Sequence, residues 1–587
     1  MAQVSDPIRL EVIRNALDGI GDGMALTLSR TSRSAIVRIA LDFSTGILNT
    51  RGELIGQGLC LPLHLGGMMP ALHACLARFN GWFDEGDIVA VNDPYSGGSH
   101  LPDIFLFKSV FIDRVHIGYV CSMAHQTDIG GRVPGGNACD STEIYQEGLR
   151  IPPVKVFEGG RRNETFFSLL EAAVRVPETV LGDFSAMLAA LEFGEREYRT
   201  LVGGYRVNDW PTYVDELLDY SERLTRQTIA DLPDGTWSFS DFVDDDGITD
   251  ESIEIVATIT KKGDEIHLDF AGTSPQCRGA IQPVIATTRA VSLAVFKCVL
   301  TALGVDVPNN AGYFRPFIVS APEGCFVNPR PPAAVGARGL GYMRAGHAVI
   351  GAFAKMLPEL MYTCPGSCEL GVMSSGYVPR AGEASKPWVL LDFHSESAMG
   401  ARPDKDGIEA AGAGINNIAN IPVEQIEAEY PIRIEEYGLL SNTEGPGKFR
   451  GALGMARSWR YLAPETTVQV RSDRMKTSPW GLAGGGSANP TRIEMNSGGE
   501  TRSMPSKFQV TMTSGDLIRA YMPGSGGWGP ASERDPRLVA RDVSEEKISI
   551  ERAADKYRVA VNSEDMTVDV EATERLRDRE RGSPVTV

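Results

Sequence analysis

The chain has 587 residues, of which 42% are hydrophobic and 23% are charged, and its formal net charge is -19. This length predicts roughly three to four compact units of a soluble, folded protein. An acidic surface repels nucleic acid and anionic membranes, so both are excluded as main partners. No segment approaches the roughly 20 apolar residues of a membrane span, and the N-terminus has no signal-like pattern, so we expect a cytoplasmic protein.

The first elements expected along the chain are a helix, a hairpin and a second helix. Apolar residues recur near a 3.6 period across residues 6–33, after an Asp-Pro start signal, which predicts a long amphipathic helix. Residues 34–58 change to β character, and NTRG at 49–52 predicts a short hairpin. Another helix is expected over 65–79, with His64 just ahead of it.

A second hairpin is expected within residues 92–131, which hold three of the eight histidines. The runs IFLFKSVF and HIGYVCSM predict two antiparallel strands. A turn centred on Arg114 places Asp103 opposite His125, and directly opposed residues have Cβ atoms roughly 4.5–5.5 Å apart. His100, three residues before Asp103, can reach the same open end of the hairpin.

Two imidazoles and a carboxylate at one hairpin mouth predict a metal site. His100, Asp103 and His125 offer nitrogen and oxygen without thiolate, which suits catalytic zinc, manganese or iron better than a structural zinc knot. Asp42 is a candidate fourth ligand, because a lone acid after the apolar run AIVRIAL is costly in an ordinary buried strand. Alternatively, these residues serve turns and core packing, and a one-residue register slip turns His125 to the other face. His116, near the turn, is expected to be exposed.

The following segments predict a long loop and a mixture of helices and strands. The Gly/Pro-rich stretch 130–156 is too long for a simple connection, which is typical of a functional loop. Helices are expected over 163–230, and a β-meander over 236–275. Further helices are expected over 285–305 and 341–357.

The C-terminal part predicts a second β-rich unit. Residues 436–530 are dense in Gly and short β runs, and the last fifty residues predict a charged helix followed by a polar tail. The expected fold class is therefore α+β: a multi-domain mixed chain with β-rich units, a helical segment and a metal site at the mouth of a β-hairpin. The expected regions are an N-terminal metal-site region, a helical segment, a mixed α/β middle region, a β-rich region, and a C-terminal helix and tail, over 1–162, 163–235, 236–435, 436–535 and 536–587.

Three local patterns are interpreted as structural. The nine cysteines are thinly spread, so reduced thiols are expected, and the C-x3-C pair Cys364 and Cys368 has no second pair to complete a metal site. The glycines of 481–490 lie between β runs without a following Lys-Ser/Thr helix, so tight turns explain them better than a nucleotide loop does. DDDG at 244–247 is interpreted as a hairpin turn.

Several long motifs occur in order from near residue 6 to the ending GSGGWGPASERDPRLVARDVSEEKIS. They are LDFSTGILNTRGELIGQG, LPLHLGGM, NDPYSGGSHLPDI, GRVPGG, TEIYQEGLRIPPVK and NNIANIPVEQIEAEYPIRIEEYGLLSNTEGPGKFRGALGM. Over nearly its whole length the chain thus resembles the hydantoinase B / 5-oxoprolinase / acetone carboxylase alpha-subunit family.

The resemblance implies an ATP-dependent enzyme built from two kinds of subunit. A partner of the hydantoinase A type, with an actin-like ATPase fold, would bind ATP and Mg and phosphorylate the amide or carbonyl oxygen of the substrate. The present chain would carry the metal and complete the reaction, in a hetero-oligomer such as A2B2. Consistently, it has no G-x4-G-K-[ST] phosphate loop.

The resemblance also implies the metal ligands Asp42, His100, Asp103 and His125. It implies metal-assisted hydrolysis of a phosphorylated cyclic amide (a hydantoin, 5-oxoproline or another lactam), in which a metal lowers the pKa of bound water toward ~7. The alternatives are the equivalent subunit of an ATP-dependent ketone carboxylase and a scaffold without catalytic groups. The length of the chain favours the hydrolase, because the carboxylase subunits are generally longer.

Further candidate catalytic residues lie beside the metal motifs. Asp128 could act as a general base, or it could form a turn before two glycines. The motif TEIYQEGLRIPP provides Glu143, Tyr145, Glu147 and Arg150, which could bind phosphate or carboxylate, or could fix the loop by internal ion pairs. Asp93 and Asp128 are the undecided acids of the 92–131 stretch.

Overall fold

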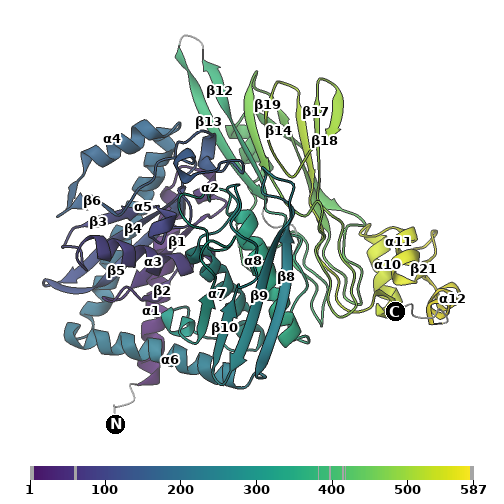
Figure 1. Ribbon diagram of the computed structural model, residues 1–587, viewed down its shortest axis with the longest axis horizontal. Helices are drawn as coiled ribbons and strands as arrows, with labels where there is room; N and C mark the ends of the chain where they lie inside the picture. The colour runs from purple at the N-terminus through teal and green to yellow at the C-terminus, as the bar shows by residue number, and fades with distance from the viewer. Residues whose placement is uncertain are drawn as a thin grey trace.

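The computed structural model is an α+β structure with several separate sheets, as the sequence predicts (Figure 1). It describes residues 6–58, 62–380, 383–394, 398–412, 415–416 and 418–581. The N-terminal elements lie on one side of the molecule, two β-sheets stand at the upper right of the view, and the C-terminal helices lie at the far end.

A seven-stranded antiparallel sheet forms the core of the N-terminal unit. Its strands are β1 (Phe43–Leu48), β2 (Leu54–Gln57), β3 (Ile88–Val91), β4 (Asp103–Ile112), β5 (Val115–His125), β6 (Val154–Glu158) and β7 (Arg161–Arg162). Their order is β2-β1-β5-β4-β3-β6-β7. The central strands are buried along nearly their whole length, so both faces of the sheet are covered.

Helices cover this sheet. They are α1 (Pro7–Thr31), α2 (Ala35–Arg38), α3 (Pro62–Arg78), α4 (Glu164–Ala173), α5 (Pro177–Gly203) and α6 (Trp210–Ala230). α1 and α5 pack on each other and on the strands, while α3 contacts β1, β3 and β4. α1 begins where predicted because Asp6 accepts the Ile8 N–H and Pro7 is the first helical residue.

The segment before β1 differs from its predicted β character. Ser34 accepts the Val37 N–H at 3.3 Å and caps the short helix α2, so AIVRIAL is not a strand. Leu41 then takes a positive φ of 62°, which turns the chain and presents Asp42 at the start of β1. α3 begins at Pro62, so His64 lies in its first turn rather than ahead of it.

The β4–β5 hairpin has the predicted register at its open end, where Asp103 pairs with His125. Near the closed end one extra residue, Ile117, forms a bulge in β5. The turn itself is Asp113–Arg114, and both residues have positive φ, as in the preferred two-residue hairpin turns. The bulge absorbs the difference between this two-residue turn and the predicted turn centred on Arg114.

The middle of the chain forms a four-stranded sheet with two buried helices. These elements are β8 (Gly235–Val243), β9 (Ile253–Lys262), β10 (Glu265–Asp269), β11 (Phe317–Ser320), α7 (Ile285–Ala302) and α8 (Gly339–Met356). The strand order is β11-β10-β9-β8, with α8 packed on β8 and β9. By length and composition alone α7 could cross a membrane, but most of this helix is buried in the protein. It packs against both α3 and α8.

Residues 244–247 do not form the expected tight turn. The connection between β8 and β9 spans residues 244–252, and the Asp244 carboxylate accepts backbone N–H groups of Met475, Lys476 and Thr477. The acidic run therefore anchors a distant segment of the chain.

Two further sheets carry the β-rich part. Their strands are β12 (Leu370–Arg380), β13 (Glu383–His394), β14 (Ile432–Leu440), β15 (Gly454–Tyr461), β16 (Thr466–Arg471), β17 (Arg492–Ser497), β18 (Glu500–Ser503), β19 (Lys507–Met512) and β20 (Leu517–Tyr521), with the helix α9 (Val423–Glu429) before β14. The orders are β13-β12-β16-β19 and β14-β15-β20-β17-β18. The first sheet thus pairs β12 and β13, which lie before residue 435, with β16 and β19, which lie after it. Residue 435 is the expected boundary between the middle region and the β-rich region.

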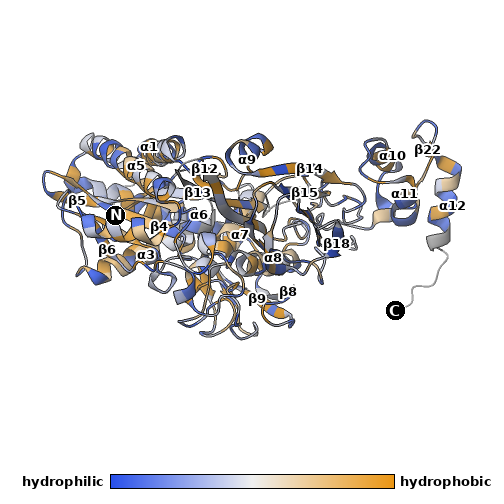
Figure 2. Cartoon of the chain, turned by 90° about the horizontal axis from the view of Figure 1, so that it is seen from above, coloured by the Kyte–Doolittle hydropathy of each residue, from blue (hydrophilic) through white to orange (hydrophobic). Residues whose placement is uncertain are grey.

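The C-terminal part contains more structure than one helix and a tail. It comprises α10 (Pro536–Ser544), α11 (Ile550–Tyr557), β21 (Ala560–Val561), β22 (Val568–Asp569) and α12 (Val570–Arg581), set apart at one end of the molecule (Figure 2). Asp535 and Ser549 cap separate helices, and a small core includes Val539, Ile548 and Tyr557. The end of the predicted tail, 582–587, lies outside the described residues.

Candidate metal centre

The open end of the β4–β5 hairpin gathers three buried donors. His100 lies just before β4, Asp103 is its first residue, and His125 is the last residue of β5. One ligand atom of each lies within 4.8 Å of those of the other two. All three are almost fully buried, which makes any unpaired charge among them costly.

Hydrogen bonds fix the tautomer of His100. Its Nδ1 lies 2.8 Å from the Gly336 carbonyl oxygen, which can only accept, so Nδ1 carries the proton. In the neutral ring the Nε2 lone pair then faces Asp103 Oδ1 at 3.1 Å. A lone pair facing a carboxylate oxygen is unfavourable unless a cation lies between them. This arrangement fits a bound metal ion.

His64 adds a donor that the sequence reasoning did not assign. The Ser44 hydroxyl donates to the Phe43 carbonyl and accepts from His64 Nδ1 at 3.0 Å, which leaves the lone pair on Nε2. That Nε2 lies 3.7 Å from Asp42 Oδ1 and 4.0 Å from Asp103 Oδ2. In the sequence, His64 stood out only through its place in the motif LPLHLGGM. Residues 62, 63 and 65 flank His64 in α3.

Asp42 is brought to this cluster by the backbone. Its carbonyl accepts the His125 N–H at 3.1 Å, which extends the β1–β5 pairing to the cluster. The predicted ligands Asp42, His100, Asp103 and His125 therefore lie together, with His64 beside them. His116 is half-buried rather than exposed, because its ring packs on Tyr119.

Burial dominates the electrostatics of the cluster. It lowers the pKa of His64 to about 3 and holds the pKa values of His100 and His125 below their ordinary range, so the imidazoles are neutral. Burial and the nearby Asp103 charge raise the pKa of Asp42 to about 8. Although burial opposes ionisation of Asp103, the Arg338 guanidinium beside it helps to bring its pKa well below the usual value.

The donor set fits a divalent cation. Neutral imidazoles and carboxylates are the forms that bind metals, and His125 Nδ1 is buried without a hydrogen-bond partner among the described residues. Arg338 is the cation that pairs with Asp103, and it also donates to Ser99. Asp42, His64, His100, Asp103 and His125 are the residues that could hold the ion.

Asp128 is placed away from this arrangement. Its carboxylate accepts the Gly135 N–H at 2.9 Å and the Arg175 N–H at 2.6 Å, and it pairs with the Arg175 guanidinium at 3.1 Å. The side chain is fully buried. These contacts fix the loop after β5 and occupy the carboxylate that a general base would need.

Two of the loop candidates, Glu143 and Tyr145, face outward. Glu143 is exposed and pairs with Ala333 through its backbone, and the Tyr145 side chain is 66% exposed. Arg150 donates to Asp93 at 2.9 Å. No described hydrogen bond or ion pair joins these three residues to the candidate metal ligands.

Glu147, in the same motif, is buried behind the cluster. Its Oε1 accepts the N–H groups of Val335 and Gly336 at 2.9 and 2.6 Å. Gly336 is the residue whose carbonyl fixes His100. Burial raises the pKa of Glu147 to about 8. Glu147 thus supports the backbone that orients a candidate ligand.

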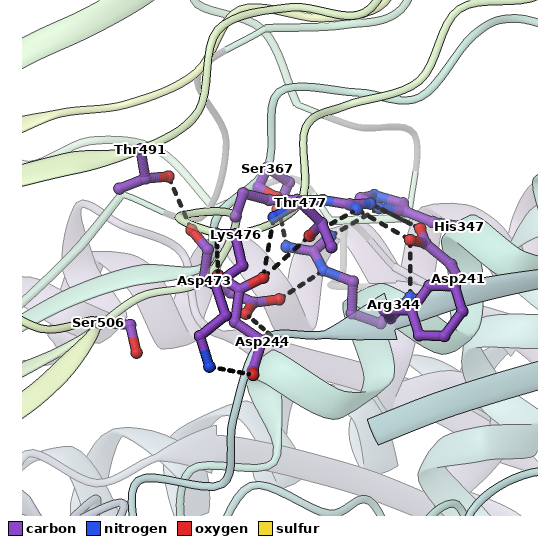
Figure 3. A network of polar contacts seen from close by, with 12 residues as sticks. Asp241, Asp244, Arg344, His347, Ser367, Asp473, Lys476, Thr477, Thr491 and Ser506 are labelled. Carbon is purple, nitrogen blue, oxygen red and sulfur yellow. Dashed lines mark hydrogen bonds and ion pairs between the residues drawn. The ribbon is translucent and has the colours of Figure 1, made fainter. Parts of the chain in front are cut away.

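A second group with metal-like composition consists of Asp241, His347 and Cys364, all buried (Figure 3). Here Arg474 Nη2 lies 2.6 Å from Asp241 Oδ2, 3.1 Å from His347 Nδ1 and 3.2 Å from Cys364 Sγ. Arg344 also donates to His347 Nδ1 at 2.7 Å. A guanidinium therefore already occupies the centre of this group. Cys364 and Cys368 are not in disulfides, nor are the other described cysteines, while Cys60 lies outside the described residues.

Comparison with known proteins gives consistent matches along the chain. The model of the Hydantoinase B/oxoprolinase family matches residues 6–531. The chain is 31% identical to the B component of a putative D-/L-hydantoinase from a Pseudomonas strain, over 97% of this chain and 98% of that protein. It is 30% identical to the caprolactamase beta subunit of Pseudomonas jessenii, over 95% of this chain and 96% of that protein.

Solved structures match the fold as well. The crystal structure of the ATP-dependent caprolactamase from Pseudomonas jessenii superposes with a TM-score of 0.90 at 29% identity, covering 98% of this chain and 100% of the other. A nucleotide-free acetone carboxylase structure superposes with a TM-score of 0.89 at 18% identity, covering 98% of this chain and 83% of the other, and at this identity the likeness concerns the fold alone.

Proposed function

Because the chain belongs to the hydantoinase B/oxoprolinase family, we propose that it is the metal-bearing subunit of an ATP-dependent hydrolase of small cyclic amides. The substrate is a hydantoin, 5-oxoproline or another lactam whose amide oxygen is phosphorylated by an ATPase partner of the hydantoinase A type. The relatives are named as one subunit of a hydantoinase and as the beta subunit of a caprolactamase, which supports a cyclic amide substrate and a second subunit.

One observation carries the metal assignment. The Nε2 lone pair of His100 faces the Asp103 carboxylate with no proton between them, and His64 Nε2 and Asp42 lie beside this pair. When bound there, zinc, or alternatively manganese or iron, would act as a Lewis acid that activates water at neutral pH.

The residues of the chain contribute orientation, charge and exclusion of bulk water. The Gly336 carbonyl and the Ser44 hydroxyl hold the protons of His100 and His64 away from the cluster, so both Nε2 atoms remain available. Arg338 offsets the charge of Asp103 and adds positive charge beside the site, which suits a phosphorylated, anionic substrate. Burial strengthens each of these electrostatic interactions.

The remaining parts of the proposal concern the assembly. ATP and Mg bind the partner, the complex is a hetero-oligomer such as A2B2, and it works in the cytoplasm. The runner-up function is the equivalent subunit of an ATP-dependent ketone carboxylase. Relatives that match nearly the full chain and are named for cyclic amides favour the hydrolase.

The test is substrate-dependent ATP hydrolysis by the reconstituted two-subunit complex. Hydantoins, 5-oxoproline, caprolactam and ketones are compared, each with and without bicarbonate. We expect ADP and a ring-opened product only with a cyclic amide, and loss of both on metal removal. Turnover of a ketone that requires bicarbonate would establish the carboxylase instead.

A further inference from the structure

We propose that Glu369 contacts the phosphorylated cyclic amide and carries a proton from the attacking water to the ring nitrogen. This inference rests on the proposed function and deepens it, because it assigns the proton-transfer group of that same site. Nothing in the local sequence around Glu369 indicates the role, since it lies more than 200 residues after the hairpin in a loop before β12.

Glu369 combines strain, burial and an available oxygen. Its φ is +48°, in the left-handed region that non-glycine residues rarely adopt, and its side chain is 3% exposed. Oε1 accepts from Arg471 Nη2 at 2.9 Å. Oε2 is buried and has no hydrogen-bond partner among the described residues. A buried carboxylate oxygen is costly without a partner, so a ligand that donates to it is favoured.

The carboxylate belongs to the same buried space as the metal cluster. Its partner Arg471 lies over the Phe393 ring, 4.9 Å from the ring centroid, and that ring packs on His125 with centroids 5.8 Å apart. The carboxylate lies directly against Gly339, where an added Cβ would be 2.0 Å from Oε1. Gly339 follows Arg338, the residue that pairs with Asp103. The glycine thus makes room for the carboxylate beside the cluster.

The polar network of Figure 3 holds this strained loop in place. Arg344 donates through Nη2 to the Ser367 carbonyl at 2.8 Å and through Nε to Asp473 at 2.7 Å. Ser367 lies two residues before Glu369, and Asp473 lies two residues after Arg471. The network therefore fixes both partners of the Glu369–Arg471 ion pair, although no described hydrogen bond or ion pair joins it to the candidate metal ligands.

The chemistry of ring opening requires such a group. The phosphorylated amide has a C=N bond, and ring opening needs the oxygen of water to bond to carbon while both water protons end on nitrogen. Glu369 Oε2 takes one proton as water adds to carbon and gives it to the ring nitrogen. It then takes the second proton from the new hydroxyl, which becomes a carbonyl, and gives it to the same nitrogen as the C–N bond breaks with its electron pair going to nitrogen. The products are an amine and an acyl phosphate, and a second water hydrolyses the acyl phosphate to carboxylate and phosphate.

Protonation of nitrogen decides which bond breaks. If nitrogen stays unprotonated after water adds, phosphate is the better leaving group and the C–O bond breaks. That route returns the intact cyclic amide and consumes ATP without ring opening. Glu369 therefore governs the number of rings opened per ATP hydrolysed, in addition to the rate.

The experiment compares Glu369→Gln with wild type in the reconstituted complex, measuring bound metal, ADP and ring-opened product. We expect full metal content and about a 100-fold loss of ring opening with a smaller loss of ATP hydrolysis, so that product per ADP falls sharply. Glu444→Gln, which alters a buried glutamate paired with Arg552, is the matched control and should keep the wild-type ratio. An unchanged product-to-ADP ratio in Glu369→Gln overturns the proposal.

Two further variants keep the test decisive if Glu369→Gln folds poorly. Gly339→Ala displaces the carboxylate without changing its chemistry, and Glu369→Asp retains a carboxylate. We expect Gly339→Ala to hydrolyse ATP with little ring opening, and Glu369→Asp to recover part of the wild-type ratio of ring-opened product to ADP. Coupled turnover in Gly339→Ala and loss of metal in Glu369→Asp would both contradict the proposal. Absence of ring opening in the wild-type complex with every cyclic amide would instead refute the proposed function, which separates the two failures.

Discussion

Asp103 and His125 face each other across the open end of one hairpin, as directly paired residues of β4 and β5. Because the strands fix both Cα positions, the distance between carboxylate and imidazole depends on backbone pairing more than on loop conformation. His100 and Asp42 then reach the cluster from the residues just outside this pair.

Replacing His125 by alanine should remove bound metal and lower turnover by at least about 100-fold, because an imidazole donor is lost. The matched control is His116→Ala, on the same hairpin near its turn. Metal content by elemental analysis and turnover of the complex check the prediction. Equal metal content in both variants would contradict it.

Replacing Asp128 by alanine should cost about 3 kcal/mol of the free energy of unfolding, because two backbone N–H groups and Arg175 lose their acceptor. Metal content should stay at the wild-type level, because the carboxylate contacts none of the candidate ligands by a described hydrogen bond or ion pair. Denaturant unfolding and metal analysis measure the two effects. Metal loss with unchanged stability would argue for a direct catalytic role.

Glu147→Gln should flatten the dependence of stability on pH. Burial raises the pKa of Glu147 from 4.5 to about 8. Its contribution to the free energy of unfolding is therefore complete below about pH 4.5 and is lost as pH rises through 8. The slope is at most about 1.4 kcal/mol per pH unit. Glutamine resembles the protonated acid, so we expect similar melting temperatures at pH 5 and a more stable variant at pH 9. If the melting temperatures of wild type and variant changed in parallel from pH 5 to pH 9, Glu147 would not have the raised pKa.

Cys364→Ala should leave the metal content unchanged. Arg474 already fills the space between Cys364, His347 and Asp241, so no metal ion is needed there. We expect one metal ion per chain in the wild type and in the variant, measured after exhaustive chelation and reloading. Two ions per wild-type chain and one per variant chain would reassign this group as a metal site.

Local patterns predict the parts of the structure that depend on neighbouring residues. The long helix α1, the hairpin register and the meander of β8 to β10 follow from periodicity, capping and turn residues close in sequence. α2 was missed because four residues cannot establish a helical period, and the Ser34 cap outweighs the β preference of Ile and Val.

The candidate site was predictable only in part for the same reason. Asp103 and His125 are related by strand pairing, which can be counted along the chain. Arg338, just before α8, reaches Asp103 through tertiary packing, and Glu369, in the loop before β12, lies against Gly339. No spacing rule connects either residue to the hairpin. Asp128 shares a motif with His125, but its partner Arg175 lies 47 residues further on.

The burial of the cluster also bears on when during synthesis an ion can enter it. Asp42 to His125 leave the ribosome early, whereas Gly336 and Arg338, which enclose them, are synthesised more than 200 residues later. At roughly 5–20 residues per second, the donors exist without this cover for roughly 10–40 s. Entry of the proposed metal ion is least hindered during that interval, so loading of the nascent chain should be faster than reloading of the folded protein.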